Sequence, residues 1–226
     1  MKPSQIIYLD NHLLVVNKPA SILIQGDKTG DETLFDQAKL YLKKAFHKPG
    51  NVYLGLIHRL DRPVSGVVVF ARTSKAASRL SEQFRSKSIT KIYRALVEGK
   101  TAEQGILKDR ILRKGPTSCI AKNGQGKQAI LTYRRLQQKD GLSHLEVTIE
   151  TGRHHQIRVQ LSHLGFPILG DFRYGSKREF PQRSIALHSH SITLQHPVSK
   201  EDLIFTAKPE IPWPLYPLPS DLQSSN

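Results

Sequence analysis

The strongest strand signal along the chain is the apolar run at residues 67–71, which is rich in β-branched side chains. Gly66 precedes this run and the polar residues 72–74 follow it, so both of its ends are marked. Directly before it lies the polar stretch 58–66, in which Pro63 and Gly66 are typical turn residues. The pattern therefore predicts a tight loop, carrying Asp61, that leads into a buried strand.

Alternating or continuous apolar runs predict the other strands, at residues 6–9, 13–16, 92–97, 106–112, 129–136, 142–149, 185–188, 192–194 and 203–206. Helical spacing predicts three helices. The first covers residues 34–45 with Asp31 or Thr33 as N-cap, the second begins near Ser74, and a short third one follows Gly152 and ends at Gly165. The strands gather in meanders between helices, which indicates an α+β fold with a largely antiparallel mixed sheet flanked by helices. We expect one domain over residues 1–212 and a partly disordered tail over 213–226.

Charge adds a prediction about the partner. The 226 residues include 34 Lys and Arg against 19 Asp and Glu, a net charge of +15. Such an excess favours a polyanion, most often a nucleic acid. Cys119 is the single cysteine, so no disulfide framework or cysteine metal cage is expected. No apolar stretch approaches the roughly 18 residues of a membrane span and no signal peptide is visible, so we expect a cytoplasmic protein and no membrane partner.

Several kinds of active site are disfavoured by the motifs. The ten histidines form no HExxH or Cys/His pattern, and His154 and His155, being adjacent, are expected to point to different sides of a helix. Paired carboxylates, a G-x-S-x-G elbow and a dinucleotide fingerprint are also missing. What remains is a carboxylate (Asp61), a strand tyrosine (Tyr93) and an arginine at a helix start (Arg153), a set able to act on a nucleotide. On spacing alone, Asp61 could equally belong to a turn held by an Asp–Arg pair.

The stretch 56–66, with His58-Arg59-Leu60-Asp61, closely resembles the H-R-L-D-x-x-[ST]-S-G motif of the RluA-type pseudouridine synthases. Four further stretches resemble the family in the same order: Asn17-Lys18-Pro19, residues 91–95, residues 151–158 and residues 170–175. Together they cover roughly residues 6–207. Val64 and His154 depart from the usual pattern, and neither departure touches the carboxylate.

This resemblance implies a pseudouridine-synthase-like domain that isomerises uridines in RNA, with Asp61, Tyr93 and Arg153 as catalytic residues. Asp61 would attack the sugar or remove its 2′ hydrogen, Tyr93 would stack on the base, and Arg153 would pair with Asp61. Arg59 would fill the gap left by the flipped uridine. Further substrate or RNA contacts are expected from His58, Arg62, Lys91, Ile157 and Arg158.

By the same resemblance the reaction is an internal rearrangement, so no metal and no organic cofactor is expected. The first predicted strand begins at Ile6, which implies that the N-terminal S4 RNA-binding domain of many family members is absent. The expected partner is ribosomal RNA or transfer RNA, bound by a monomer. Two other functions stay open: a non-catalytic RNA-binding protein that kept the fold, and a glycosidase that acts on nucleosides or RNA.

Overall fold

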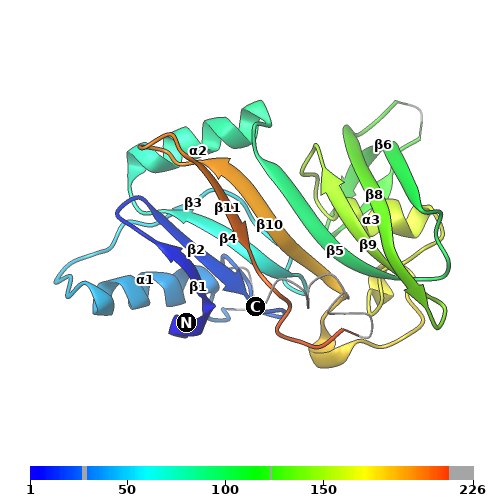
Figure 1. Cartoon of the computed structure of the whole chain (residues 1–226), viewed down its shortest axis with the longest axis horizontal. Coiled ribbons are helices and arrows are strands. Elements are labelled where there is room, and N and C mark those ends of the chain that lie inside the picture. The colour runs from blue at the N-terminus through cyan, green and yellow to red at the C-terminus, as the bar shows by residue number, and fades with distance from the viewer. Residues whose placement is uncertain (27–29, 123, 214–226) are drawn as a thin grey trace, which may run out of the picture. The chain divides into compact units, whose positions relative to one another are not determined.

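The computed structural model describes residues 1–26, 30–122 and 124–213. The chain divides into two compact units (Figure 1). Unit 1 comprises Met1–Thr90 and Ser189–Lys208, and unit 2 comprises Lys91–His188 with the segment that begins at Pro209. The domain predicted for residues 1–212 spans both units, and its limits stay a prediction.

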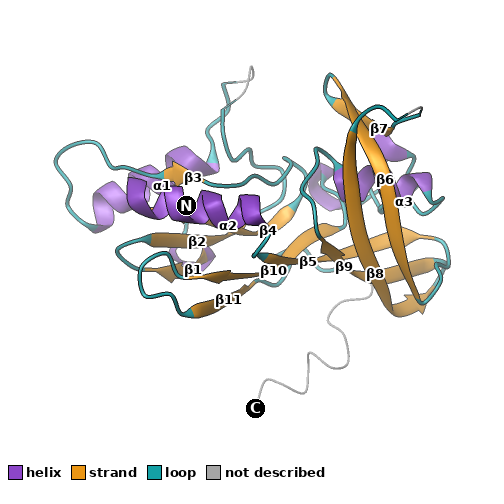
Figure 2. Ribbon diagram, turned by 90° about the horizontal axis from the view of Figure 1, so that it is seen from above, coloured by secondary structure: helices purple, strands orange, loops and turns teal. Residues whose placement is uncertain are grey.

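Unit 1 is a sheet covered by two helices. Its elements are η1 (Pro3–Gln5), β1 (Ile6–Leu9), β2 (Leu13–Lys18), α1 (Leu34–Ala45), β3 (Gly55–Leu56), β4 (Ser65–Ala71), α2 (Ser74–Ser86), β10 (Leu187–Gln195, from Ser189 onwards) and β11 (Asp202–Thr206). The strand order is β1-β2-β4-β10, with β11 beside β10 and β3 beside β4. Both helices lie on the same face of this sheet (Figure 2).

The centre of unit 1 is β4, the strand predicted most strongly by the sequence. All its residues from Gly66 to Ala71 are buried, as expected for a continuous apolar run. Strand β2 pairs with it antiparallel, and the register places Lys18 opposite Gly66. Both helices begin with an N-cap, because the hydroxyl groups of Thr33 and Thr73 accept the backbone N–H groups of Asp36 in α1 and Ala76 in α2.

Unit 2 is a meander of long strands around one short helix. It contains β5 (Thr90–Glu98), β6 (Gln104–Lys114), β7 (Thr117–Ile120), β8 (Lys127–Lys139), β9 (Leu142–Ile149), α3 (Gln156–His163), η2 (Phe172–Tyr174) and η3 (Pro181–Arg183). The strand order is β5-β9-β8-β6-β7, and each of these pairs whose register is known is antiparallel. Helix α3 contacts β6 and β7.

The described part of unit 2 ends at Trp213, which is buried. Its indole lies within 6.4 Å, centroid to centroid, of the rings of His144, Phe180 and His188. The first residue of the predicted tail therefore packs into the unit, and the rest of that tail lies outside the described residues.

The observed elements confirm the α+β class and the largely antiparallel sheet. Helix α1 has the predicted bounds, and of the two candidate caps Thr33 is the one used. Some strand predictions were wrong in detail: the strands predicted at 185–188 and 192–194 are one strand, β10, which begins only at Leu187, and the short strands β3 and β7 were missed. Within the described residues, none of the helices combines the length and apolar character that a membrane crossing requires.

Candidate active site

The loop that carries Asp61 is held by a buried lysine. Lys18, at the end of β2, is 0% exposed, and its ammonium group donates to three backbone carbonyls. These are the oxygens of Pro19 at 3.0 Å, Arg62 at 3.1 Å and Val64 at 2.6 Å. Two of these three carbonyls belong to the Asp61 loop, so the side chain of Lys18 helps to fix the backbone position of this loop.

The burial of Lys18 has an electrostatic cost. The pKa of Lys18 is lowered to about 7, chiefly by burial and to a smaller extent by the positive charge of Arg62, and the negative charge of Asp61 opposes this shift. Lys18 belongs to the Asn17-Lys18-Pro19 stretch that resembles the family, and no site role was predicted for it from the sequence.

Arg62 ties the same loop to the segment before α1. Its guanidinium Nη2 lies 2.8 Å from Asp31 Oδ2, and its Nε donates to the Ser21 carbonyl at 3.1 Å. In return the Ser21 N–H donates to the Arg62 carbonyl at 2.8 Å. The ion pair is half exposed, so this geometry gives Arg62 a structural task and leaves its predicted RNA contact a prediction. Arg59, the predicted gap-filling residue, is exposed.

His58 joins the loop to the sheet. Its Nε2 accepts the backbone N–H of Val69 at 3.0 Å, so the ring takes the place of a strand carbonyl beside β4. The ring also stacks on Phe84 of α2, at 5.0 Å between centroids. An imidazole used in this way shapes the entry to the loop, and the substrate contact predicted for His58 stays a prediction.

Gly66 closes the loop where β4 begins. Its φ is +119°, and a Cβ at this position would lie 2.3 Å from the backbone oxygen of Ser189 and 2.5 Å from its nitrogen. Both the conformation and the close approach require glycine here.

In unit 2, Tyr93 and Lys91 lie on β5. Tyr93 is 8% exposed and stands opposite Val147 of β9. Lys91 is partly buried, and burial lowers its pKa. Tyr93 therefore lies on a strand, as predicted, rather than on a loop.

Arg153 lies at the junction between β9 and α3, as predicted. Its Nε donates to the Gln128 carbonyl of β8 at 2.9 Å, and its backbone N–H donates to Gln156 Oε1 at 3.0 Å. The side chain and the backbone of this arginine are thus each tied by a hydrogen bond.

Two other predicted contacts lie in the interior of unit 2. Arg158 is 4% exposed and forms two hydrogen bonds with Asp171, at 2.7 and 2.9 Å, while its guanidinium lies 5.0 Å from the centroid of the Tyr174 ring. Ile157 is 5% exposed. Neither geometry favours a direct RNA contact, because both side chains are taken up by packing.

The expected orientation of the adjacent histidines was wrong. The rings of His154 and His155 stack at 3.8 Å, because His155 has a left-handed backbone (φ 55°) that turns it back before α3 begins. His154 Nδ1 lies 2.9 Å from the Ser118 hydroxyl, and His155 Nδ1 lies 2.7 Å from the Tyr174 hydroxyl. Within the described residues, no group of three or more His, Cys, Asp or Glu could hold a metal ion.

Comparison with known proteins places these features in a family. A family model described as RNA pseudouridylate synthase matches residues 12–163. The chain is 35% identical over 214 residues to ribosomal large subunit pseudouridine synthase D of Pseudomonas aeruginosa, covering 86% of this chain and 65% of that protein. It is 33% identical over 234 residues to the protein of the same name from Zymomonas mobilis, covering 98% of this chain and 71% of that protein. The chain thus spans about two thirds of the length of these relatives.

Two solved human structures have the same fold. Human RNA pseudouridylate synthase domain containing 4 matches with a TM-score of 0.77 at 23% identity, over 91% of this chain and 88% of that one. Human RNA pseudouridylate synthase domain containing 1 matches with a TM-score of 0.72 at 28% identity, over 92% and 86%. On the family model and the curated relatives, this chain belongs to the RNA pseudouridylate synthase family.

Proposed function

We propose that this chain is an active RNA pseudouridine synthase that converts uridine in large-subunit ribosomal RNA to pseudouridine, with Asp61 as the essential carboxylate. The observation that carries the proposal is the anchored Asp61 loop, in a chain that carries the family motif around it. The names of the curated relatives support ribosomal RNA over transfer RNA as the substrate.

The reaction is an isomerisation within one nucleotide. The bond between uracil N1 and C1′ of the ribose breaks, the base turns, and a bond forms between C5 and C1′. C5 then loses its proton and N1 gains one, so that no atom is added or lost. Asp61 either attacks C1′ or removes the 2′ hydrogen, and both routes need an ionised carboxylate in a fixed position. Tyr93 and Arg153 keep the roles that the family motif implies.

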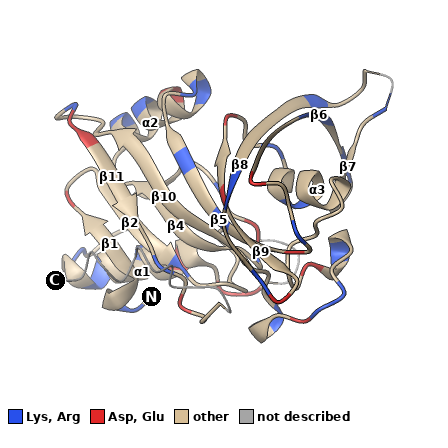
Figure 3. Cartoon of the chain, turned by 45° about the vertical axis from the view of Figure 1, so that its right-hand side comes forward, with Lys and Arg blue, Asp and Glu red and all other residues tan. Residues whose placement is uncertain are grey.

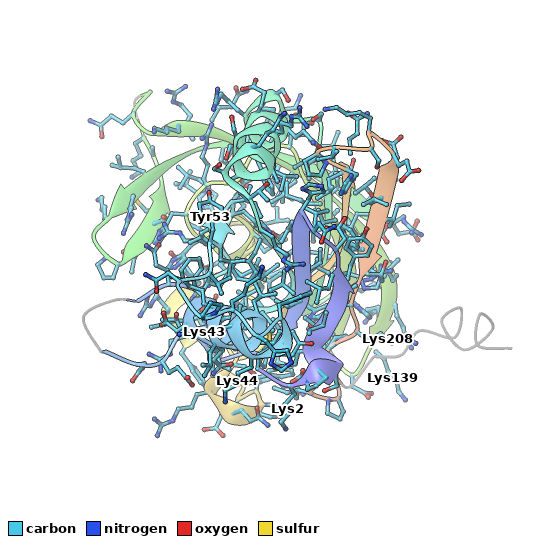
Figure 4. The ribbon with its side chains drawn as sticks, turned by 90° about the vertical axis from the view of Figure 1, so that its left-hand side faces the viewer. Lys2, Lys43, Lys44, Tyr53, Lys139 and Lys208 are labelled. Carbon is cyan, nitrogen blue, oxygen red and sulfur yellow. The ribbon has the colours of Figure 1, made fainter. Side chains whose placement is uncertain are left out.

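Exposed cations on each unit support RNA as the partner. In unit 1, Lys2, Lys43 and Lys44 are exposed (Figure 4). In unit 2, exposed lysines and arginines line β6 (Figure 3), at Lys108, Arg110, Arg113 and Lys114. Lysine and arginine contacts to phosphates give binding that weakens with added salt. We propose that the chain meets this RNA in the cytoplasm, as a monomer.

The test is tritium release from a large-subunit ribosomal RNA transcript that carries tritium at C5 of uridine. The wild-type protein should release tritium to water, and Asp61→Asn should lose on the order of 10⁴-fold in rate, as when a catalytic carboxylate is removed. Its affinity for the RNA should be unchanged. Salt-sensitive binding without any release would favour a non-catalytic RNA-binding protein, and activity that survives Asp61→Asn would contradict the role of the carboxylate.

A further inference from the structure

We propose that Gln156 is a positioning residue for Arg153, acting with Thr151 to hold the arginine against β8. This inference rests on the proposed function, because it assigns Gln156 the task of positioning a residue that the proposed function makes catalytic. All of the atoms involved belong to unit 2.

The amide of Gln156 is 4% exposed and forms three side-chain hydrogen bonds. Its Oε1 accepts the Arg153 backbone N–H at 3.0 Å and the Thr151 hydroxyl at 2.8 Å. Its Nε2 donates to the Ile130 carbonyl of β8 at 3.0 Å. An amide oxygen offers two acceptor positions, so both are filled.

Thr151 completes a closed ring of hydrogen bonds. Its hydroxyl oxygen accepts the Ile130 N–H at 3.0 Å and donates its proton to Gln156 Oε1. The two polar backbone atoms of Ile130 are thus bound by two side chains from the junction. Since Thr151 is 5% exposed, these bonds form away from water, where losing one leaves an unsatisfied polar group.

The same strand also fixes the side chain of Arg153. The guanidinium Nε donates to the carbonyl of Gln128, two residues before Ile130 on β8. Strand β8 therefore holds Arg153 at two points. It holds the backbone of Arg153 through Gln156, and it binds the guanidinium group of Arg153 directly. With Nε bound and the main chain fixed, the plane of the guanidinium and the direction of its terminal nitrogens are set by β8. Because a displacement of about 1 Å can cost 100-fold in rate, this clamp bears directly on catalysis.

The variants separate positioning from folding. Gln156→Met keeps the approximate size but removes the amide, and Thr151→Val keeps the shape but removes the hydroxyl. Thr151→Ser restores the hydroxyl and should rescue activity. The matched control is Gln160→Met, because Gln160 lies on the same helix, is 1% exposed and bonds to Asp109 and β8 rather than to Arg153.

The first measurement is the single-turnover rate of tritium release from the same ribosomal RNA transcript, at saturating protein. Gln156→Met and Thr151→Val should lower the rate roughly 10- to 100-fold, with the RNA dissociation constant unchanged. Gln160→Met should stay within about twofold of the wild type. In an Arg153→Ala background the effect of Gln156→Met should vanish, because the two residues act as one unit. An equal loss in both backgrounds would overturn the proposal.

The second measurement does not depend on activity. Nuclear magnetic resonance of ¹⁵N-arginine-labelled protein should show slow solvent exchange of the Arg153 Nε–H in the wild type and in Gln160→Met. Exchange should be faster in folded Gln156→Met and Thr151→Val. Unchanged exchange in these variants would overturn the positioning role. If the wild type releases no tritium, the proposed function fails, and this measurement still decides the positioning role. The exchange measurement also decides the positioning role if tritium release in the Arg153→Ala background is too slow to measure.

Discussion

The Asp61 loop and the Arg153 junction are each held by a buried polar side chain, Lys18 in the first region and Gln156 in the second. These two side chains differ in charge. Lys18 directs an ammonium group at three backbone carbonyls, and its burial opposes its charge. Gln156 uses a neutral amide that gives and accepts hydrogen bonds. A charged anchor interacts with a carboxylate nearby and responds to pH, whereas a neutral anchor fixes geometry at all pH values.

The first way to break the comparison is a pair of glycine variants. Gly66→Ala should destabilise the protein by on the order of 5 kcal/mol, because φ is +119° and the new Cβ would collide with the Ser189 backbone. Gly152→Ala, beside Arg153, should change stability by less than about 0.5 kcal/mol, because a Cβ there meets nothing within 4 Å. Urea unfolding measures both. If both substitutions lowered the free energy of unfolding by the same amount, the two regions would be equally constrained.

The second prediction concerns pH. The unfolded chain binds a proton at Lys18 up to its ordinary pKa of 10.5, whereas the folded protein releases it near 7, so the free energy of unfolding should rise with pH between these values. The full rise is at most about 5 kcal/mol. Urea unfolding at several pH values checks this rise. The contribution of Lys18 is the difference between the free energies of unfolding of the wild type and Lys18→Met at each pH. Gln156→Met should keep the wild-type slope, and a slope retained in Lys18→Met would contradict the assignment.

The third prediction sharpens the contrast between internal and external cations in unit 2. Arg158→Met should cost about 3–5 kcal/mol of stability, because it leaves Asp171, only 2% exposed, without its partner. The affinity for ribosomal RNA, measured by filter binding at a temperature where the variant is folded, should not change. A loss of affinity with unchanged stability would instead establish the RNA contact predicted from the sequence.

The smallest effect is expected at the stacked histidines. His154→Thr removes the contact of the imidazole Nδ1 with the Ser118 hydroxyl and the stacking on His155, while the hydrogen bond from Ser118 to the backbone carbonyl of residue 154 stays. We expect a loss of about 1 kcal/mol in thermal or chemical unfolding, because one hydrogen bond contributes about that much. The rate of tritium release should be unaffected. A large change in that rate would mean that the stack sets the position of Arg153.

Local patterns predicted most of the fold. The apolar run of β4 and the helical spacing of α1 each involve only neighbouring residues, so the sequence alone was sufficient to find them, and it narrowed the N-cap of α1 to Asp31 or Thr33. Strand β7 was missed because it is short and its four residues carry only one strongly apolar side chain, Ile120. The stacking of His154 on His155 depends on a left-handed backbone that a non-glycine residue seldom adopts.

The anchors of the site were harder to predict than its motifs. Lysine is almost never fully buried, so nothing in the pattern around Lys18 indicated that its ammonium group lies beneath the Asp61 loop. Gln156 was not indicated either, since its partner on β8, Ile130, lies more than 20 residues away along the chain. The resemblance to a family drew attention to both segments but assigned neither anchor a task.

Unit 1 is built from two segments that lie far apart along the chain, and this separation affects the order in which the unit can fold during synthesis. When the ribosome has made residues 1–90, strands β1 to β4 exist, but β10 and β11, which complete their sheet, are almost 100 residues from being translated. Until then the edge of β4 that pairs with β10 is open, and Gly66 lacks the Ser189 backbone against which it is fitted. Pairing between such distant segments is slow to form. The nascent chain is therefore most exposed to aggregation in the interval before its last strands emerge, and the Asp61 loop is among the last parts to be completed.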